Sequence, residues 1–458
     1  MLLRTKLFGK TYEFPDIRLL MGKANEEKSG DRLAGVGAET AAERMAARYV
    51  LAEVPLWVLH DTPAVPYADD EVTRVIQDGV NQTIYREIKD WSVGQFREWL
   101  LADTTDGAMI RRISQGLTAE MIAGVTKLMS NLDLVYAASK IRVTAHCNNT
   151  IGMPGTLASR NQPNHPTDSP EGIRAEIYEG LAFGSGDSVI GINPVDDSYA
   201  SVARLLDMTY DIIQTWQIPT QNCVLAHVTT QMKCLEAGSP VGLIFQSLAG
   251  SQRGNESFGI SVPLLDEAYA LARKHCFTAG PSYMYFETGQ GSELSADAHH
   301  GWDQLVMEAR CYGLAKRYQP FQVNTVVGFI GPEYLYDARQ IQRAGLEDHF
   351  MGKLTGIPMG CDACYTNHAR ADQNAIENLA VMLTAAGCNY FMGVPMGDDS
   401  MLSYQCTSYH DAPTLRQLFK LRPNPEFEAW MEQLGLMCNG RLTEKAGDPS
   451  FFLQRRAA

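Results

Sequence analysis

Short apolar runs that each end in a single polar residue recur along this chain, and they constrain its fold more than any other feature. They occupy residues 189–192 before Asn193, 224–226 before His227, 243–245 before Gln246, 284–286 before Glu287 and 357–361 before Asp362. Strands that are buried on both faces form continuous apolar runs rather than alternating ones, as in parallel sheets. A polar side chain at the carboxyl end of each strand is typical of the active-site face of a parallel α/β barrel.

Residues 141–405 show the repeated order of strand, loop and helix that is typical of a (β/α)8 TIM barrel. Their length is close to the roughly 250 residues that this fold usually needs. We predict strands near 156–159 and at 189–192, 223–226, 243–245, 283–286, 323–327, 357–361 and 390–394. We predict helices between them, including 170–181, 201–216, 263–275 and 371–386.

An open, doubly wound sheet is the alternative α/β architecture. It would need a glycine-rich dinucleotide-binding turn after the first strand, and no Gly-x-Gly-x-x-Gly sequence follows a predicted strand here. The shortest connection, from His227 to Gln246, still exceeds the roughly 10–12 residues that a helical crossover requires. We therefore favour the barrel.

The segments on either side of the predicted barrel differ from it. Residues 1–140 carry helix formers and apolar residues at helical spacing over 34–53, 73–80, 91–101 and 118–129, and Ser92 is a candidate N-cap. We interpret this segment as a mainly α-helical region that caps the barrel. Residues 406–458 form a polar C-terminal tail with a short helix near 425–434.

The composition argues against several classes of protein. The net charge of −14, without a cluster of lysines and arginines, argues against binding to nucleic acid or to an anionic membrane. No stretch approaches the roughly 20 consecutive apolar residues of a membrane span, and the N-terminus lacks the apolar core of a signal peptide. The ten cysteines are scattered, so we expect reduced thiols in a cytoplasmic protein.

Carboxylate, amide and guanidinium groups dominate the predicted strand ends. Arg160 and Gln162 follow the first strand, where the fixed fork of an arginine suits a hydroxyl or carboxylate ligand and a structural arginine–aspartate pair is the alternative. Asn193 would either emerge at the barrel mouth or cap a turn. Glu287 precedes two glycines that would let the backbone approach a ligand. Together, Glu287 and Asp362 suit a cationic amine, a metal ion or acid–base catalysis. The alternative for Glu287 is a structural pair with a buried arginine.

Other barrel chemistries lack their signatures. No lysine ends a predicted strand, which disfavours a Schiff-base aldolase, and neither His-x-His after the first strand nor His-Glu-x-x-His is present. His227 could be a base, a metal ligand or a structural histidine. Cys361 and Cys364 have ligand-like spacing but no second pair, so we interpret them as incidental to a functional Asp362. The absence of a strong nucleophile favours a site that binds a small polar molecule while a cofactor performs the difficult step.

Several long motifs resemble the large (heavy) subunit of ethanolamine ammonia-lyase. These motifs cover residues 151–156, 191–195, 224–231, 285–292, 324–336, 344–354 and 360–368. The similarity extends from about residue 1 to about residue 452, and several motifs are about ten residues long, which makes a chance resemblance implausible.

The resemblance implies an adenosylcobalamin-dependent radical enzyme that converts ethanolamine to acetaldehyde and ammonia. It implies that a small (light) subunit covers the cobalamin on the barrel and that heavy–light pairs build a large hetero-oligomer in the bacterial cytoplasm. The substrate residues it implies are Arg160, Gln162, Asn193, Glu287 and Asp362, of which Arg160, Glu287 and Asp362 are the catalytic candidates. The residues it places on the cobalamin side are Pro194, Gln246, Ser295 and Met401.

Two alternatives stay open alongside this resemblance. One is a metal-dependent lyase or hydrolase that uses Glu287, Asp362 and His227, and the other is a non-catalytic amine-binding subunit. The chain has no Asp-x-His-x-x-Gly motif, because Asp297-Ala-His-His-Gly is one residue short. We therefore predict that the cobalamin keeps its own lower base and that no protein residue binds the cobalt. The oligomer stoichiometry, the range of amino alcohols and encapsulation in a microcompartment are not determined by the sequence.

Overall fold

The computed structural model describes residues 2–7, 9–328 and 330–454, and an eight-stranded parallel sheet lies at its centre. The strand order is β7-β6-β5-β13-β11-β10-β9-β8. The sheet is nearly closed into a barrel, because the Leu243 N–H just before β8 donates to the Asn222 carbonyl of β7 at 3.0 Å. The strands are β5 (Ala158–Asn161), β6 (Val189–Ile192), β7 (Asn222–Val224), β8 (Ile244–Ser247), β9 (Met284–Thr288), β10 (Gln322–Val326), β11 (Met359–Asp362) and β13 (Tyr390–Gly393).

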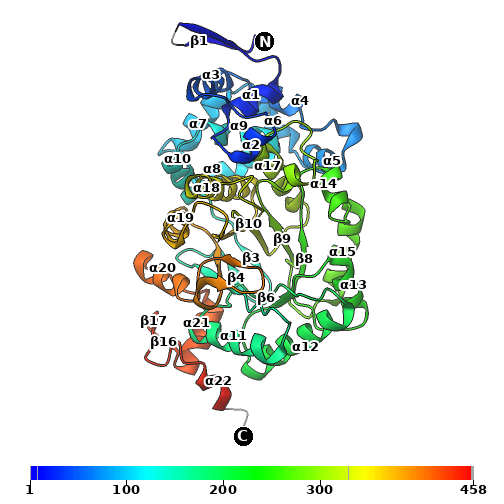
Figure 1. The fold of residues 1–458 in the computed structure, drawn as a ribbon, viewed down its shortest axis with the longest axis vertical. Helices are drawn as coiled ribbons and strands as arrows, with labels where there is room; N and C mark the ends of the chain where they lie inside the picture. Colours follow the sequence, from blue (N-terminus) through cyan, green and yellow to red (C-terminus); the bar gives the residue numbers. More distant parts are fainter. Residues whose placement is uncertain (1, 8, 329, 455–458) are drawn as a thin grey trace.

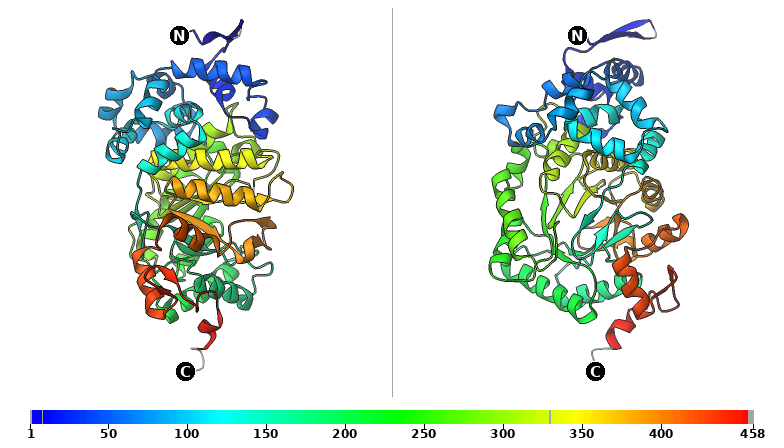
Figure 2. Two further views of the ribbon diagram at one scale, coloured as in Figure 1. Left: turned by 90° about the vertical axis from the view of Figure 1, so that its left-hand side faces the viewer. Right: turned by 180° about the vertical axis from the view of Figure 1, so that it is seen from behind.

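Each of these strands overlaps a predicted one, so the α/β barrel class is confirmed. The prediction succeeded because the strands are buried on both faces and several of them, such as β6, β9 and β11, are apolar until their carboxyl ends, although β5, β7 and β10 contain buried polar residues. The ring of helices around the strands is visible in Figure 1 and from behind in the right-hand view of Figure 2.

The helices after the strands include all four that were predicted, with ends that differ by at most two residues. They are α11 (Pro170–Ala182), α12 (Tyr199–Trp216), α13 (Val228–Glu236), α14 (Gln252–Ser257), α15 (Val262–His275), α16 (Ser292–Ser295), α17 (Gln304–Lys316), α18 (Ala338–Thr355), α19 (Gln373–Ala385) and α20 (Asp411–Phe419).

The N-terminal region is mainly helical, as predicted, but opens with a short hairpin. Its elements are β1 (Arg4–Leu7), β2 (Lys10–Glu13), α1 (Ile17–Ala24), α2 (Ser29–Leu33), α3 (Ala41–Ala52), α4 (Leu56–Asp61), η1 (Tyr67–Asp69), α5 (Glu71–Asp78), α6 (Gln82–Ile88), α7 (Val93–Leu101), α8 (Gly107–Ile113), η2 (Ser114–Gly116), α9 (Ala119–Lys127) and α10 (Asn131–Lys140). The helix predicted from residue 34 begins only at Ala41, because the Thr40 side chain accepts the Glu43 N–H as an N-cap. Ser92 caps α7 as predicted, through a reciprocal contact with Gln95.

The N-terminal helices pack against the side of the barrel rather than over its mouth. Helices α5 and α9 contact α17, and α9 and α10 contact α18, so α17 and α18 lie between the strands and a second helical layer. Figure 1 shows this layer at the N-terminal end of the long axis. Nearly every residue of α17 is buried as a result, which explains why its sequence shows no clear polar face.

Small sheets cover the two ends of the barrel. Before β5, β3 (Ala145–His146) and β4 (Thr150–Ile151) form a hairpin, and its Ala145, Cys147 and Ile151 side chains belong to the apolar cluster of the barrel interior. After β11 and β13, the strands β12 (Tyr365–Thr366), β14 (Asp398–Asp399) and β15 (Tyr404–Gln405) form an antiparallel sheet, with η3 (Pro395–Gly397) before it. This second sheet, which we call the mouth sheet, places side chains over the carboxyl ends of the strands.

The C-terminal tail contains the predicted helix, α21 (Pro425–Leu434), with β16 (Met437–Cys438), β17 (Arg441–Leu442) and α22 (Ser450–Gln454). Helix α20, which precedes α21, is anchored to the barrel through Arg416. The buried guanidinium of Arg416 pairs with Asp187, just before β6, at 3.0 Å. The division at residues 140 and 405 remains a prediction. Within the described residues, no helix is both long enough and apolar enough to cross a membrane.

Candidate active site

The five predicted substrate residues lie at the carboxyl ends of β5, β6, β9 and β11 and belong to one hydrogen-bonded network. Arg160 Nη1 donates to Glu287 Oε1 at 3.0 Å, and Arg160 Nη2 donates to Asn193 Oδ1 at 2.6 Å. Gln162 and Asp362 are joined through a residue of the mouth sheet. Gln162 Nε2 donates to the Tyr404 hydroxyl at 2.9 Å, and that hydroxyl donates to Asp362 Oδ2 at 2.8 Å.

Arg160 is buried, and each of its N–H groups has a protein acceptor. In addition to Glu287 and Asn193, it donates to the Tyr285 hydroxyl at 2.6 Å and to the Gly191 carbonyl at 3.1 and 3.3 Å. Burial alone would lower the pKa of Arg160, but Tyr285 and Glu287 raise it above its usual value. Only glycine fits at position 191, because a Cβ there would lie 2.7 Å from Arg160 Nε. Glu287 thus forms the pair with a buried arginine that was the alternative prediction for this residue.

Some polar atoms of this network are nevertheless free of protein partners. Among the described residues, Glu287 Oε2, Gln162 Oε1 and Asn193 Nδ2 take part in no hydrogen bond. The first two atoms are acceptors and the third is a donor. The network can therefore bind a small ligand that carries a cation with several N–H groups at one end and an acceptor oxygen at the other.

Asp362 is the carboxyl group of this network whose pKa is shifted toward neutral pH. Burial raises the pKa of Asp362 to about 6, and the charge of Glu287 adds to the shift. Hydrogen bonds from Cys406 and Tyr404 and the charge of Arg160 oppose it. A carboxyl group of this kind can hold or release a proton near neutral pH.

Several residues of the network were not predicted from the sequence. Tyr285 donates to Glu287 Oε1 at 2.6 Å, and Asn324 Nδ2 donates to the same oxygen at 3.2 Å. The two-residue spacing of Tyr285 and Glu287 on β9 was the available signal, because alternate strand residues share a face. No local pattern indicated the other partners, which are Asn164, Asp399, Tyr404 and Cys406.

The glycines after Glu287 allow close packing within the protein, and their predicted approach to a ligand stays a prediction. A Cβ at Gly289 would lie 2.7 Å from the Val326 carbonyl oxygen. Gly291 has a φ of 109°, and a Cβ there would lie 2.7 Å from Tyr334. Both glycines thus let the loop after β9 pack against the segment after β10.

The residues predicted for the cofactor side also follow strand ends. Gln246 is the penultimate residue of β8 and is buried, and its Oε1 accepts the Val228 N–H at 3.0 Å. Pro194 after β6 and Met401 between β14 and β15 are half-buried, and Ser295 at the end of α16 is exposed. A cavity of about 350 Å³ connects Gln246 with Glu287, and its lining also includes Leu248, Phe258, Val326 and Ile330. Pro194, Ser295 and Met401 are outside that lining.

His227 and the cysteine pair have structural surroundings. His227 is the N-cap of α13: its Nδ1 accepts the Thr229 N–H, and its Nε2 donates to the Phe258 carbonyl at 3.0 Å. Cys361 and Cys364 are buried free thiols whose pKa is raised by burial. Within residues 2–7, 9–328 and 330–454, no group of three or more histidine, cysteine, aspartate or glutamate residues is placed to hold a metal ion.

Comparison with known proteins gives a consistent result over nearly the whole chain. The family model described as ethanolamine ammonia lyase large subunit (EutB) matches residues 12–445. The chain is 56% identical over 452 residues to the ethanolamine ammonia-lyase large subunit of Escherichia coli (strain K12). It is equally similar to the protein of the same name from Salmonella typhimurium (strain LT2). Both alignments cover 99% of this chain and 100% of the relative.

Proposed function

This chain belongs to the ethanolamine ammonia-lyase large-subunit family, and from that premise we propose that the mouth of its barrel is where ethanolamine is deaminated. It is a lyase, and the large subunit is the catalytic subunit of this family. The observation that carries the proposed site is the set of free polar atoms on Glu287, Gln162 and Asn193. Two free acceptors and one free donor match the ammonium group and the hydroxyl oxygen of ethanolamine.

Glu287, Gln162 and Asp362 bind the ammonium end of the substrate in this proposal. Glu287 Oε2 accepts one N–H of the substrate ammonium group in a charge-assisted hydrogen bond, and Gln162 Oε1 accepts a second N–H. Asp362 supplies the second negative charge. Hydrogen bonds that involve a charged group contribute roughly 1.5–3 kcal/mol each, so the carboxylates account for most of the selectivity for an amine.

Asn193 and Arg160 act on the hydroxyl end. Asn193 Nδ2 donates to the substrate oxygen, because its Oδ1 is already held by Arg160 at 2.6 Å. Arg160 acts through this amide and through its charge, since its own N–H groups have acceptors. A cation fixed behind the amide stabilises negative charge that develops on the substrate oxygen during the reaction.

Asp362 handles a proton during the transfer of the amino group. With a pKa of about 6, its carboxylate accepts a proton from the bound ammonium group and returns it to the departing ammonia. Tyr404 and Cys406 keep the carboxylate in place for both steps, because each donates a hydrogen bond to one of its oxygens.

The residues at the barrel mouth fit adenosylcobalamin as the cofactor. When bound, this cofactor would supply the radical that breaks the carbon–hydrogen bond of the hydroxyl-bearing carbon. Ethanolamine fills only a small part of the cavity between Gln246 and Glu287, and the apolar side chains of that cavity suit a larger group. We propose that Gln246 holds the cofactor, with Pro194, Ser295 and Met401 on the surrounding rim.

The assembly follows from the same proposal. A small subunit covers the cofactor and excludes water from the mouth, and heavy–light pairs build a larger hetero-oligomer. We further propose that the enzyme works in the bacterial cytoplasm and that no protein residue binds the cobalt.

Electron spin resonance of the reconstituted heavy–light complex with adenosylcobalamin and ethanolamine tests the proposal. We expect a cobalt(II)–radical signal together with formation of acetaldehyde. Absence of both would contradict the cobalamin mechanism, and metal analysis of the purified chain would then test the metal-dependent alternative. Labelling the protein histidines with ¹⁵N should leave the cobalt(II) hyperfine pattern unchanged if the cofactor keeps its own base.

A further inference from the structure

We propose that Asp399 is a positioning residue that sets the hydrogen-bond polarity of the substrate site. It turns the amide oxygen of Gln162 toward the ammonium end and, through Asn164, the amide nitrogen of Asn193 toward the hydroxyl end. This inference rests on the proposed function, because it concerns how the same site distinguishes the two ends of ethanolamine.

Asp399 is a buried carboxylate on β14 of the mouth sheet that accepts four N–H groups. Its Oδ2 accepts Gln162 Nε2 at 2.8 Å and Asn164 Nδ2 at 2.7 Å. Its Oδ1 accepts the backbone N–H groups of Met401 and Leu402 at 3.1 and 2.8 Å. One side chain thus connects the substrate amides with the turn that carries Met401.

The contact with Asp399 fixes which face of the Gln162 amide the substrate meets. Both oxygens of the Asp399 carboxylate accept N–H groups, so only the amide nitrogen of Gln162 can face it. The second N–H of Gln162 is used by the Tyr404 hydroxyl at 2.9 Å. The oxygen of Gln162 is the part that remains for a ligand, and it can only accept.

Asn164 transmits the same constraint to Asn193. Because Asn164 Nδ2 faces Asp399, its Oδ1 is free to accept the backbone N–H of Asn193 at 2.8 Å. Asn164 Nδ2 also lies 3.3 Å from Asn193 Oδ1, which Arg160 Nη2 approaches to 2.6 Å. With its oxygen held from two sides, Asn193 can offer only its nitrogen to the ligand.

An asparagine at position 399 would reverse the polarity at Gln162. It has a single acceptor oxygen, whereas the aspartate accepts N–H groups at both oxygens. The backbone N–H groups of Met401 and Leu402 cannot turn, so the oxygen stays with them and the new NH₂ group faces Gln162. The Gln162 amide then turns over to accept it and presents N–H groups to the substrate ammonium, which are two donors facing each other.

The test compares Asp399→Asn with Asp398→Asn in the heavy–light complex loaded with an inactive cobalamin. Asp398 is the exposed neighbour, and among the described residues its side chain accepts a single hydrogen bond, from Gln405 Nε2 at 3.1 Å. Calorimetry measures the Kd for ethanolamine and for ethylene glycol, in which a hydroxyl group that can accept replaces the ammonium group. We expect Asp399→Asn to weaken ethanolamine binding at least tenfold and to shift the ethanolamine-to-glycol preference at least tenfold. Asp398→Asn should change both within twofold.

A merely structural role for Asp399 would weaken both ligands equally, and that result would overturn the proposal. An ethanolamine Kd within twofold of wild type would also overturn it. If the wild-type complex itself binds no ethanolamine, the proposed function fails first, so the two failures are distinguishable.

Adding Gln162→Glu to Asp399→Asn restores an acceptor toward the ligand, and it should recover at least threefold of the lost affinity. If Asp399→Asn alone does not fold, this double variant decides: ethanolamine binding within tenfold of wild type supports the proposal, and weaker binding by the folded double variant contradicts it.

Discussion

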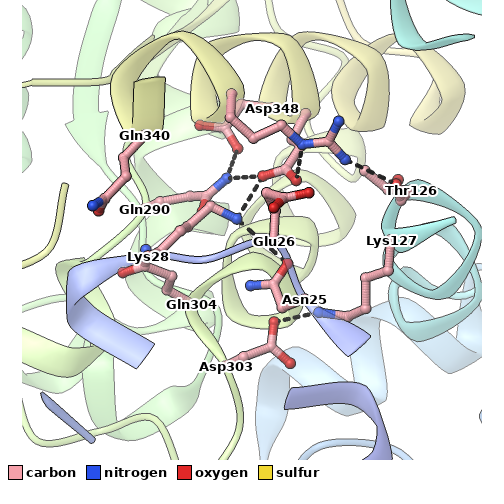
Figure 3. A network of polar contacts seen from close by, with 12 residues as sticks. Asn25, Glu26, Lys28, Thr126, Lys127, Gln290, Asp303, Gln304, Gln340 and Asp348 are labelled. Atoms are coloured by element: carbon pink, nitrogen blue, oxygen red, sulfur yellow. Dashed lines mark hydrogen bonds and ion pairs between the residues drawn. The ribbon is translucent and has the colours of Figure 1, made fainter. Parts of the chain in front are cut away.

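Two buried polar networks in this chain use similar residues but differ in what they leave free. The network between the N-terminal region and the barrel, drawn in Figure 3, contains ion pairs that are made entirely within the protein. Lys28 pairs with Glu347 at 2.7 Å, and Lys127 pairs with Asp303 at 2.5 Å, with all four side chains fully buried. At the barrel mouth, Glu287 pairs with Arg160 through one oxygen only, and its side chain remains 15% exposed.

A missing partner does not by itself mark a functional site. Gln290 Oε1 and Asp303 Oδ2 in the interface network also lack partners within the described part of the chain, but they are buried inside the protein. Glu287 at the mouth borders a cavity instead. A free polar atom therefore indicates ligand binding only where a ligand can reach it.

The pKa values of two carboxylates, one from each network, shift in opposite directions. Burial alone would raise the pKa of Glu347, but Lys28 and Arg343 lower it to about 2. At the mouth, burial prevails and raises the pKa of Asp362 to about 6. A carboxylate between two cations stays ionised, whereas Asp362 exchanges its proton near pH 6. Burial also raises the pKa of Asp31 in the interface network to about 6, so the place of Asp362 at the mouth, and not the shift alone, makes it a candidate for chemistry.

The largest expected effect is on the stability provided by the interface network. Lys28→Met leaves Glu347 buried with one cation fewer, which should cost about 3–5 kcal/mol of unfolding free energy. The folded pKa of Glu347 lies below its usual value of 4.5, so its stabilising contribution is present above that pH. The difference between wild type and variant should therefore shrink as the pH falls from 4.5 toward 2. Denaturant unfolding at several pH values measures it.

The control for this prediction is Arg253→Met, which breaks an exposed pair with Asp297. It should cost less than about 1 kcal/mol. If Lys28→Met also lowers the unfolding free energy by less than about 1 kcal/mol, the interface network contributes no more stability than an exposed ion pair, and the prediction is wrong.

The next effect is on activity at the mouth. Glu287→Gln removes the negative charge at the free oxygen but keeps an acceptor for Arg160, so turnover of ethanolamine should fall about a hundredfold to a thousandfold. Unfolding free energy should change by no more than about 1 kcal/mol. Steady-state kinetics and denaturant unfolding separate the two effects, with the exposed Glu256→Gln as the matched control. A variant that unfolds easily but keeps its turnover would place Glu287 with the structural carboxylates.

Arg160→Lys tests whether the mouth needs the geometry of the guanidinium or only its charge. A lysine keeps the charge but cannot hold Tyr285, Gly191, Glu287 and Asn193 together, so turnover should fall more than about tenfold. Arg160→Ala should lose at least as much. Near-normal activity of Arg160→Ala would exclude Arg160 from the site, and Arg253→Lys serves as the exposed control.

The smallest expected effect is the pH dependence of substrate binding. Below its pKa of about 6, Asp362 is neutral and attracts the ammonium group less; above it, the carboxylate is charged. Ethanolamine affinity should therefore rise by about tenfold between pH 5 and pH 7 through this group. Calorimetric titration measures the change. An Asp362→Asn variant should bind more weakly and lose this pH step, and a step that persists in the variant would assign it to another group.

The sequence was sufficient for the barrel and for placing most of the candidate site residues at strand ends. Strands buried on both faces have a local signature, and the polar residue after each strand marks where it leaves the core, as at Asn193, Glu287 and Asp362. Local signals also located the Ser92 cap and the helix α21. These features depend on residues within a few positions of each other.

The tertiary structure alone decided which polar atoms are used and which remain free. Asp399 and Tyr404 reach Gln162 across more than 200 residues of sequence, and no periodicity indicates that contact. Whether burial raises the pKa of a carboxylate, as at Asp362, or is outweighed by nearby charge, as at Glu347, depends on the cations that distant helices bring beside it. The sequence by itself thus determined the barrel and its polar mouth. Only the fold decided which donors and acceptors of that mouth face a ligand, because the residues that pair with the others come from distant parts of the chain.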